Sequence, residues 1–133
     1  MKSLLLVAHG SRRAASNDEV RALTERLAGQ AGSDYGYVDC AFLELAQPSI
    51  PDGIQRCIDA GSTQVVVLPY FLSAGRHVVT DIPAEVDIVR REHPAVAISV
   101  APYVGAAGGL VELLLTQAQD CPRTANTGSE NAS

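Results

Sequence analysis

Four short apolar runs, each followed by an amphipathic segment, constrain the fold of this chain more than any other feature. Continuous apolar runs of strand length, such as residues 4–8 and 65–68, are typical of parallel strands covered on both faces. The segments between them carry apolar residues at helical spacing, for example Ile50, Ile54 and Ile58. Because parallel strands need crossover connections, this alternation predicts an α/β fold built on a parallel sheet.

The expected order of elements is βαβαβαβα. The strands are expected at residues 4–8, 35–45, 64–71 and 96–101. The helices are expected at residues 16–31 and 49–60, from 80 or 81 to Pro94, and from 110 onward. Ser16 and Glu19 form a capping-box pattern at the start of the first helix. We expect a three-layer sandwich whose four-stranded sheet has the flavodoxin-like order 2-1-3-4.

Composition and length limit the class of protein. A chain of 133 residues predicts one domain, which we place at residues 1–120, followed by a polar and disordered tail at 121–133. The hydrophobic fraction of 47% excludes a disordered chain. The net charge of −5 argues against nucleic acid as a partner. No apolar run approaches the ~18 residues of a membrane span, so we expect a cytoplasmic protein with no membrane partner.

The cysteines predict neither a disulfide framework nor a metal site. Cys40, Cys57 and Cys121 are odd in number, and no two are close enough in sequence for a CxxC motif. We interpret them as small hydrophobic residues in a reducing compartment.

Polar residues with catalytic potential follow three of the predicted strands. His9 follows the first strand, Glu44 lies at the end of the second, and His77 follows the third. In the order 2-1-3 these strand ends are neighbours, and ligands bind open parallel sheets beyond the carboxyl ends of the strands. Two imidazoles and a carboxylate suit a divalent transition metal and can also accept protons. The alternative for Glu44 is a structural pair, and His93 is interpreted as a surface residue at a helix end.

The same loops hold candidate substrate-binding residues. Arginine forks suit carboxylates and phosphates, glycines allow close approach or positive φ, and serines donate hydrogen bonds. Simple solvation of the arginines, and ordinary turn formation by the glycines and Ser11, are the alternatives. Neither a P-loop nor a GxGxxG fingerprint is present. The candidates are Gly10, Ser11, Arg12, Arg13, Ser73, Gly75 and Arg76.

Three separated motifs resemble the CbiX/SirB family of sirohydrochlorin chelatases. They are the opening LLLVAHGSR at residues 4–12, the segment AFLE at 41–44 with Pro48 and Ser49, and LPYFLSAGRHV at 68–78 followed by DIP at 81–83. Their order and spacing match over residues 3–118, nearly the whole expected domain.

The resemblance implies a type II chelatase fold and ATP-independent insertion of a divalent metal into sirohydrochlorin. Co²⁺ is favoured, with Fe²⁺ or Ni²⁺ as alternatives, and no further cofactor is implied. His9 and His77 correspond to the family's metal ligands and proton acceptors, and Glu44 to its acidic residue. Longer members contain two lobes facing one cleft, whereas this chain has one, so the resemblance implies a homodimer.

Two other functions stay open at this point. One is a metal carrier or tetrapyrrole-binding module without turnover. The other is a histidine-based phosphatase, although in that family an arginine precedes the histidine and here Ala8 does.

Overall fold

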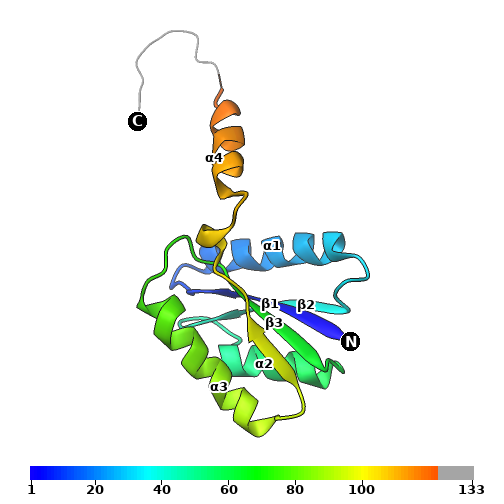
Figure 1. The fold of residues 1–133 in the computed structure, drawn as a ribbon. Coiled ribbons are helices and arrows are strands. Elements are labelled where there is room, and N and C mark those ends of the chain that lie inside the picture. The colour runs from blue at the N-terminus through cyan, green and yellow to red at the C-terminus, as the bar shows by residue number, and fades with distance from the viewer. Residues whose placement is uncertain (123–133) are drawn as a thin grey trace.

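The sheet has four parallel strands in the order β2-β1-β3-β4, as the sequence predicts. This architecture comes from a computed structural model that describes residues 1–122 (Figure 1). The strands are β1 (Lys2–Ala8), β2 (Tyr37–Phe42), β3 (Gln64–Pro69) and β4 (Ala97–Val100). The order places β1 and β3 at the centre, so the ends of β2, β1 and β3 are adjacent.

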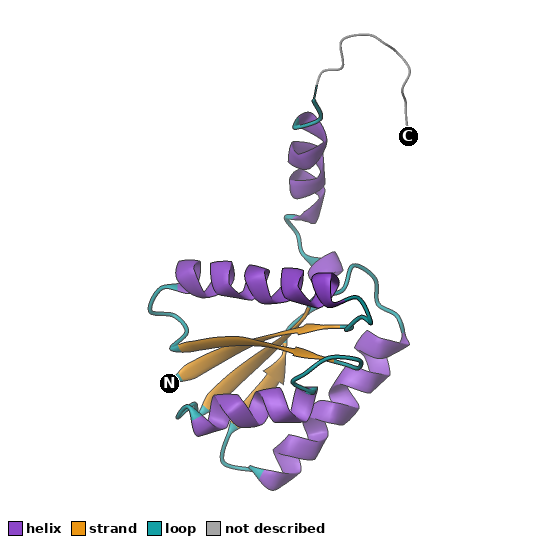
Figure 2. Ribbon diagram, turned by 180° about the vertical axis from the view of Figure 1, so that it is seen from behind, coloured by secondary structure: helices purple, strands orange, loops and turns teal. Residues whose placement is uncertain are grey.

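Helices cover both faces of the sheet, which confirms the three-layer sandwich (Figure 2). One helix lies on one face and two lie on the other, while a fourth projects from the domain. The helices are α1 (Ala14–Ala31), α2 (Ile50–Asp59), α3 (Ile82–Glu92) and α4 (Leu110–Gln119). A π-helical turn (His77–Asp81) runs into α3, and a 3-10 turn (Val104–Ala106) precedes α4.

The core divides into a large and a small cluster on opposite faces. The large cluster joins alternate residues of the strands, such as Leu5 and Val67, to α2 and α3. The small cluster lies under α1 and includes Leu6 and Phe42. Every second residue of a strand points to the same face, so the apolar runs supply both clusters.

The start of α1 differs from the predicted capping box. The helix begins at Ala14, with Arg13 in the N-cap position, and Ser16 lies inside the first turn. The predicted signal was overridden because Asn17 bonds to the preceding loop and draws the helix start back toward the strand. Gly29 lies within the helix, and Gly32 ends it with a φ of 63°.

Other boundaries also shift. β2 ends at Phe42, earlier than the predicted residue 45, because residues 43–48 form a bend in which Leu45 takes a φ of 68°. β3 and β4 are shorter than predicted by one or two residues at their carboxyl ends. Helical structure after β3 begins at His77 rather than at residue 80 or 81.

The three cysteines are free, and two of them are buried. Cys40 and Cys57 are buried free thiols, and burial raises the pKa of Cys57 to about 11. Cys121 is exposed. The predicted disordered tail falls almost entirely outside the described residues, so it stays a prediction. None of the helices in residues 1–122 has the length and hydrophobicity of a bilayer span.

Candidate functional site

The two histidines and Glu44 meet at the carboxyl edge of the sheet. The His9 Nε2 and Glu44 Oε2 atoms lie 3.1 Å apart. The rings of His9 and His77 lie 4.8 Å apart between centroids, in an edge-on arrangement. The strand order explains this meeting, because His9 follows β1 and its two neighbours on the sheet carry the other two residues. All three side chains are partly open to solvent and thus accessible to a ligand.

Both imidazoles are hydrogen-bonded through the same ring nitrogen, Nδ1. The Nδ1 atom of His9 lies 3.0 Å from the Gly10 carbonyl oxygen, and that of His77 lies 2.8 Å from Asp81 Oδ2. Both oxygens are acceptors, so each Nδ1 donates a proton. The Nε2 atom of His77 is left for a ligand, whereas the Nε2 atom of His9 faces the Glu44 carboxylate and must exchange that contact to bind one. A second ring nitrogen bonded to a carbonyl or a carboxylate is the arrangement found around metal-binding histidines.

In the sequence, Asp81 is indicated only as a helix start and as part of the DIP motif at residues 81–83. It lies four residues after His77, on the π-helical turn, and accepts the His77 hydrogen bond. The backbone N–H of Ile82 reaches back to the His77 carbonyl, the five-residue step of a π-helix, and such turns are frequent at functional sites. The His-x-x-x-Asp spacing in the sequence was the available signal.

An acidic hollow of about 310 Å³ opens beside His77. Glu44, Asp81 and Glu85 line it together with two apolar residues. Three carboxylates raise the local concentration of cations at this position. Within residues 1–122, no three His, Cys, Asp or Glu side chains are grouped to hold a metal ion together. The rim therefore offers a pair of imidazole nitrogens with carboxylates nearby rather than a closed metal cage.

Gly10 allows the first two loops to approach each other. Its φ is 95°, and a Cβ atom at this position would lie 1.7 Å from the Glu44 carbonyl oxygen. Backbone bonds join the same loops, from Leu43 N–H to the Ala8 carbonyl and from Glu44 N–H to the His9 carbonyl, at 2.9 and 3.1 Å. The close packing of two backbones thus holds His9 beside Glu44.

Asn17 is a second residue that sequence reasoning missed. Its buried side chain accepts from the Ser11 N–H at 3.0 Å and donates to the Ser11 carbonyl at 2.8 Å. It therefore fixes the loop that follows His9 to the first turn of α1. Its position on a helix beside Asp18 and Glu19 looks like a solvated surface in the sequence, so no local pattern indicates this role.

We expect Asn17→Ala to lower the free energy of unfolding by about 1–3 kcal/mol. The substitution leaves the backbone groups of Ser11 without their partner, and unpaired polar groups cost about that much. Urea denaturation followed by circular dichroism measures the change. Asp18→Ala is the matched control, because the exposed Asp18 makes only a surface ion pair with Arg21 and should change stability by at most about 1 kcal/mol. Equal stability of Asn17→Ala and the wild type would contradict the loop-fixing role.

The predicted substrate-binding residues surround this rim without direct pairing to it. Ser11 Oγ accepts the Arg13 N–H at 3.0 Å. Ser11 therefore stabilises a local turn, which was the alternative to a role in substrate binding. Arg12, Arg13 and Arg76 are exposed, and in the described part of the chain none of them forms an ion pair. Their guanidinium groups remain available to an anionic ligand.

The remaining residues singled out in the sequence lie in the loop after β3 and at the end of α3. Ser73 and Gly75 are exposed in the loop between β3 and the π-helical turn. Gly75 does not take a positive φ, whereas Gly10 does. Of these two glycines, only Gly10 therefore has a backbone conformation that favours glycine. Phe71 packs against the core, whereas Leu72 is exposed. His93 bonds through Nε2 to Gln55 at 2.9 Å, after α3, and is not part of the rim.

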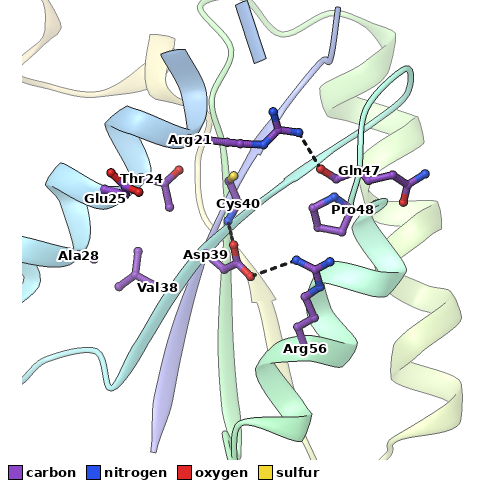
Figure 3. Close-up of a pocket in the computed structure, with 10 residues that line it drawn as sticks. All are labelled: Arg21, Thr24, Glu25, Ala28, Val38, Asp39, Cys40, Gln47, Pro48 and Arg56. Atoms are coloured by element: carbon purple, nitrogen blue, oxygen red, sulfur yellow. Dashed lines mark hydrogen bonds and ion pairs between the residues drawn. The ribbon is translucent and has the colours of Figure 1, made fainter. Parts of the chain in front are cut away.

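A second hollow of about 310 Å³ lies along the outer edge of β2 (Figure 3). Three of its charged side chains have partners: Arg56 lies 3.9 Å from Asp39, and Arg21 donates to the Gln47 carbonyl at 3.1 Å. Glu25 also lines the hollow. Asp39 also accepts from the Tyr37 hydroxyl, and burial together with this bond raises the pKa of Tyr37 to about 12. None of the candidate site residues lines this hollow.

Comparisons with known proteins identify relatives that share sequence and fold with this chain. A sirohydrochlorin ferrochelatase of Arabidopsis thaliana chloroplasts is 33% identical over 118 residues, which are 89% of this chain and 52% of that protein. The crystal structure of a candidate cobalamin (vitamin B12) biosynthesis CbiX protein from Marinobacter aquaeolei VT8 is 29% identical. It matches with a TM-score of 0.77 over 90% of this chain and 96% of that one.

A third similarity is to a longer protein. The sirohydrochlorin chelatase SirB from Bacillus subtilis subspecies spizizenii, solved in complex with cobalt, is 28% identical with a TM-score of 0.78. The match covers 90% of this chain and 50% of that one. The chain spans about half the length of the curated relatives it matches. The CbiX family model matches residues 3–121, and the chain belongs to this family.

Proposed function

We propose that this chain inserts a divalent metal into sirohydrochlorin without ATP, as a homodimer. The observation that carries the proposal is the pair of imidazoles on one rim, each hydrogen-bonded through Nδ1, with a Glu44 oxygen 3.1 Å from Nε2 of His9. Membership of the CbiX family supports it, since the Arabidopsis thaliana and Bacillus subtilis relatives named above are sirohydrochlorin chelatases. Co²⁺ is the favoured metal, with Fe²⁺ and Ni²⁺ as alternatives that suit the same ligands.

The rim exchanges a metal ion for protons. Insertion places M²⁺ on the macrocycle nitrogens and releases two pyrrole N–H protons. The Nε2 atoms of His9 and His77 hold the metal first, and each becomes free to accept one proton when the metal leaves. Glu44, 3.1 Å from His9 Nε2, and Asp81, bonded to His77, stabilise the resulting imidazolium ions. Two protons thus replace one divalent cation at the rim, so the net charge of the rim is unchanged.

The surrounding surface suits a flat anionic macrocycle. The free guanidinium groups of Arg12, Arg13 and Arg76 match the carboxylates of sirohydrochlorin. Leu45 and Leu72, both more than half exposed beside the rim, offer apolar contact to the ring. One lobe contacts one face of the macrocycle, and a second copy would cover the other. A cytoplasmic location stays a prediction.

Anaerobic absorption spectroscopy tests this function. Purified protein is mixed with sirohydrochlorin and Co²⁺, Fe²⁺ or Ni²⁺, and the rate of spectral change is compared with the spontaneous reaction. We expect acceleration with at least one metal. Binding of sirohydrochlorin with no acceleration by any metal would instead identify a carrier and overturn the proposal.

We expect Asp81→Asn to lower the rate of insertion and the affinity for Co²⁺ by about 10-fold or more. An amide cannot stabilise a charged imidazole as a carboxylate does, and partners of metal-binding histidines typically contribute 10–100-fold. Asp87→Asn is the matched control, because Asp87 lies on α3 and pairs only with Arg90 at 2.8 Å. Unchanged Co²⁺ affinity in Asp81→Asn would contradict the positioning role of Asp81.

A further inference from the structure

Arg21 of α1 contacts both ends of the loop that carries Glu44, residues 43–48. Its guanidinium carbon lies 5.1 Å from the centroid of the Phe42 ring, at the residue where β2 ends and this loop begins. Its Nη2 atom donates to the Gln47 carbonyl at 3.1 Å, near the other end of the loop (Figure 3). One side chain of the helix therefore spans the base of the loop.

The Arg21 guanidinium is also held from its own helix. Its Nη1 atom lies 3.0 Å from Asp18 Oδ1, one turn earlier on α1. The two terminal nitrogens thus face two different acceptors, and the planar fork of arginine holds both bonds at once. The Arg21 side chain is 45% exposed, so it lies over the surface of the domain rather than in the core. The ion pair with Asp18 therefore directs the second nitrogen at Gln47.

The two halves of the loop are anchored in different ways. The first half is joined to the loop after β1 by the two backbone bonds described above. At the second half, the Phe42 N–H donates to the Pro48 carbonyl at 2.8 Å, and Phe42 and Ser49 form an isolated parallel bridge. Among the described residues, Arg21 makes the one side-chain hydrogen bond that a backbone group of residues 43–48 receives. The second half therefore depends on Arg21 for its attachment to α1.

Leu45, in the middle of the loop, has an unfavourable backbone conformation. Its φ is 68°, and it is the only non-glycine residue of residues 1–122 with a positive φ. Such a conformation persists only where the surrounding structure fixes it. The Leu45 side chain is 54% exposed, so its own burial does not supply this constraint. The anchors on either side of Leu45, at Glu44 and at Gln47, must therefore hold it in place.

The position of the Glu44 carboxylate depends on this loop. The side chain is 53% exposed, so packing does not fix it, yet its Oε2 atom lies 3.1 Å from His9 Nε2. In the described part of the chain, Arg21 has no recorded hydrogen bond or ion pair with His9, Glu44 or His77. Arg21 therefore affects the rim only through the backbone of the loop.

We propose that Arg21 is a positioning residue for metal insertion, which holds the loop so that Glu44 faces His9. The inference rests on the proposed function, in which Glu44 stabilises the His9 imidazolium ion. Without Arg21, the second half of the loop loses its bond to α1, and the carboxylate leaves the position that faces His9. A displacement of about 1 Å at a reacting group can lower a rate by up to about 100-fold.

A double-mutant cycle with Glu44 tests whether Arg21 acts through this carboxylate. We expect Arg21→Ala to lower kcat for metal insertion by about 10-fold, with a smaller change in KM. Glu44→Gln keeps both rim histidines and should retain a measurable rate. In that background Arg21→Ala should lower kcat by less than about 2-fold, because the carboxylate it positions is already absent. Additive effects, a wild-type kcat in Arg21→Ala, or a rise in KM alone would overturn the proposal.

Two further variants separate positioning from a general loss of charge. Arg21→Lys should recover part of the rate, because its ammonium group can still donate to the Gln47 carbonyl. Arg26→Ala is the matched control on the same helix. Arg26 is exposed and has no recorded ion pair or hydrogen bond within residues 1–122, so this variant should insert metal at the wild-type rate. A loss in Arg26→Ala equal to that in Arg21→Ala would contradict a specific role of Arg21.

Amide hydrogen exchange, followed by NMR without metal or substrate, tests the anchoring itself. We expect Arg21→Ala to exchange the Glu44 amide about 10-fold faster, since a hydrogen bond to a charged group typically contributes at least that factor. The amides of β1 and β3 should exchange at the wild-type rate, as expected for local loosening. Unchanged exchange at Glu44, or equal acceleration throughout the sheet, would overturn the proposal. A wild-type chain without insertion activity would refute the proposed function, whereas the exchange experiment would still decide whether Arg21 anchors the loop.

Discussion

We expect His9→Ala and His77→Ala each to lower the enzymatic rate of metal insertion by about 100-fold or more. Each substitution removes one of the two Nε2 atoms that the proposal assigns to the metal and the protons, and positioned proton acceptors typically contribute 10²–10⁴-fold. Both residues are in loops at the rim and are partly exposed, so the fold should be retained. Anaerobic absorption kinetics with sirohydrochlorin and Co²⁺ measure the rate, and circular dichroism checks the fold.

His93→Ala is the matched control for these variants. His93 is the third histidine of the chain, and its only recorded side-chain partner among the described residues is Gln55. The rate of insertion by His93→Ala should equal that of the wild type. A His9→Ala/His77→Ala double variant that inserts metal at the wild-type rate would refute the assignment of the site.

We expect Gly10→Ala to lower the free energy of unfolding by about 2–4 kcal/mol and to abolish most metal insertion. Alanine is strained at a φ of 95°, and its Cβ would overlap the Glu44 carbonyl at 1.7 Å. Strain and overpacking each cost about 1–3 kcal/mol. Separation of the two loops would also move His9 away from Glu44. Urea denaturation and the insertion assay measure the two effects.

Gly29→Ala provides a control of opposite sign. Gly29 lies within α1, and a Cβ there would meet nothing within 4 Å. Alanine favours helices over glycine by about 0.5–1 kcal/mol, so this variant should be slightly more stable than the wild type. A Gly10→Ala variant as stable as Gly29→Ala would show that the close approach of the two loops is unimportant.

The sheet and the meeting of His9, Glu44 and His77 were predictable from the sequence. Apolar runs with no alternation identify buried parallel strands, and their spacing leaves room for crossover helices. Once the order 2-1-3-4 was assumed, the residues after three adjacent strands had to lie at one edge. These inferences depend on topology, which a local misreading of one boundary does not alter.

The supporting residues were not predictable, because their roles depend on contacts across the fold. Asn17 looks like an exposed helix residue until its bonds to Ser11 are known. The His77–Asp81 bond depends on a π-helical turn, for which the sequence has no reliable signal. The apolar spacing of α4 predicted a helix but not its projection from the domain, because helical periodicity does not specify where a helix lies in the fold.

X-ray absorption at the cobalt edge of the Co²⁺-loaded protein tests most directly whether His9 and His77 bind the metal. We expect a spectrum with two imidazole ligands and oxygen ligands in the wild type. The imidazole scattering should fall by half in either single variant and vanish in His9→Ala/His77→Ala, while His93→Ala should match the wild type. Imidazole scattering that persists unchanged in the double variant would contradict the central claim.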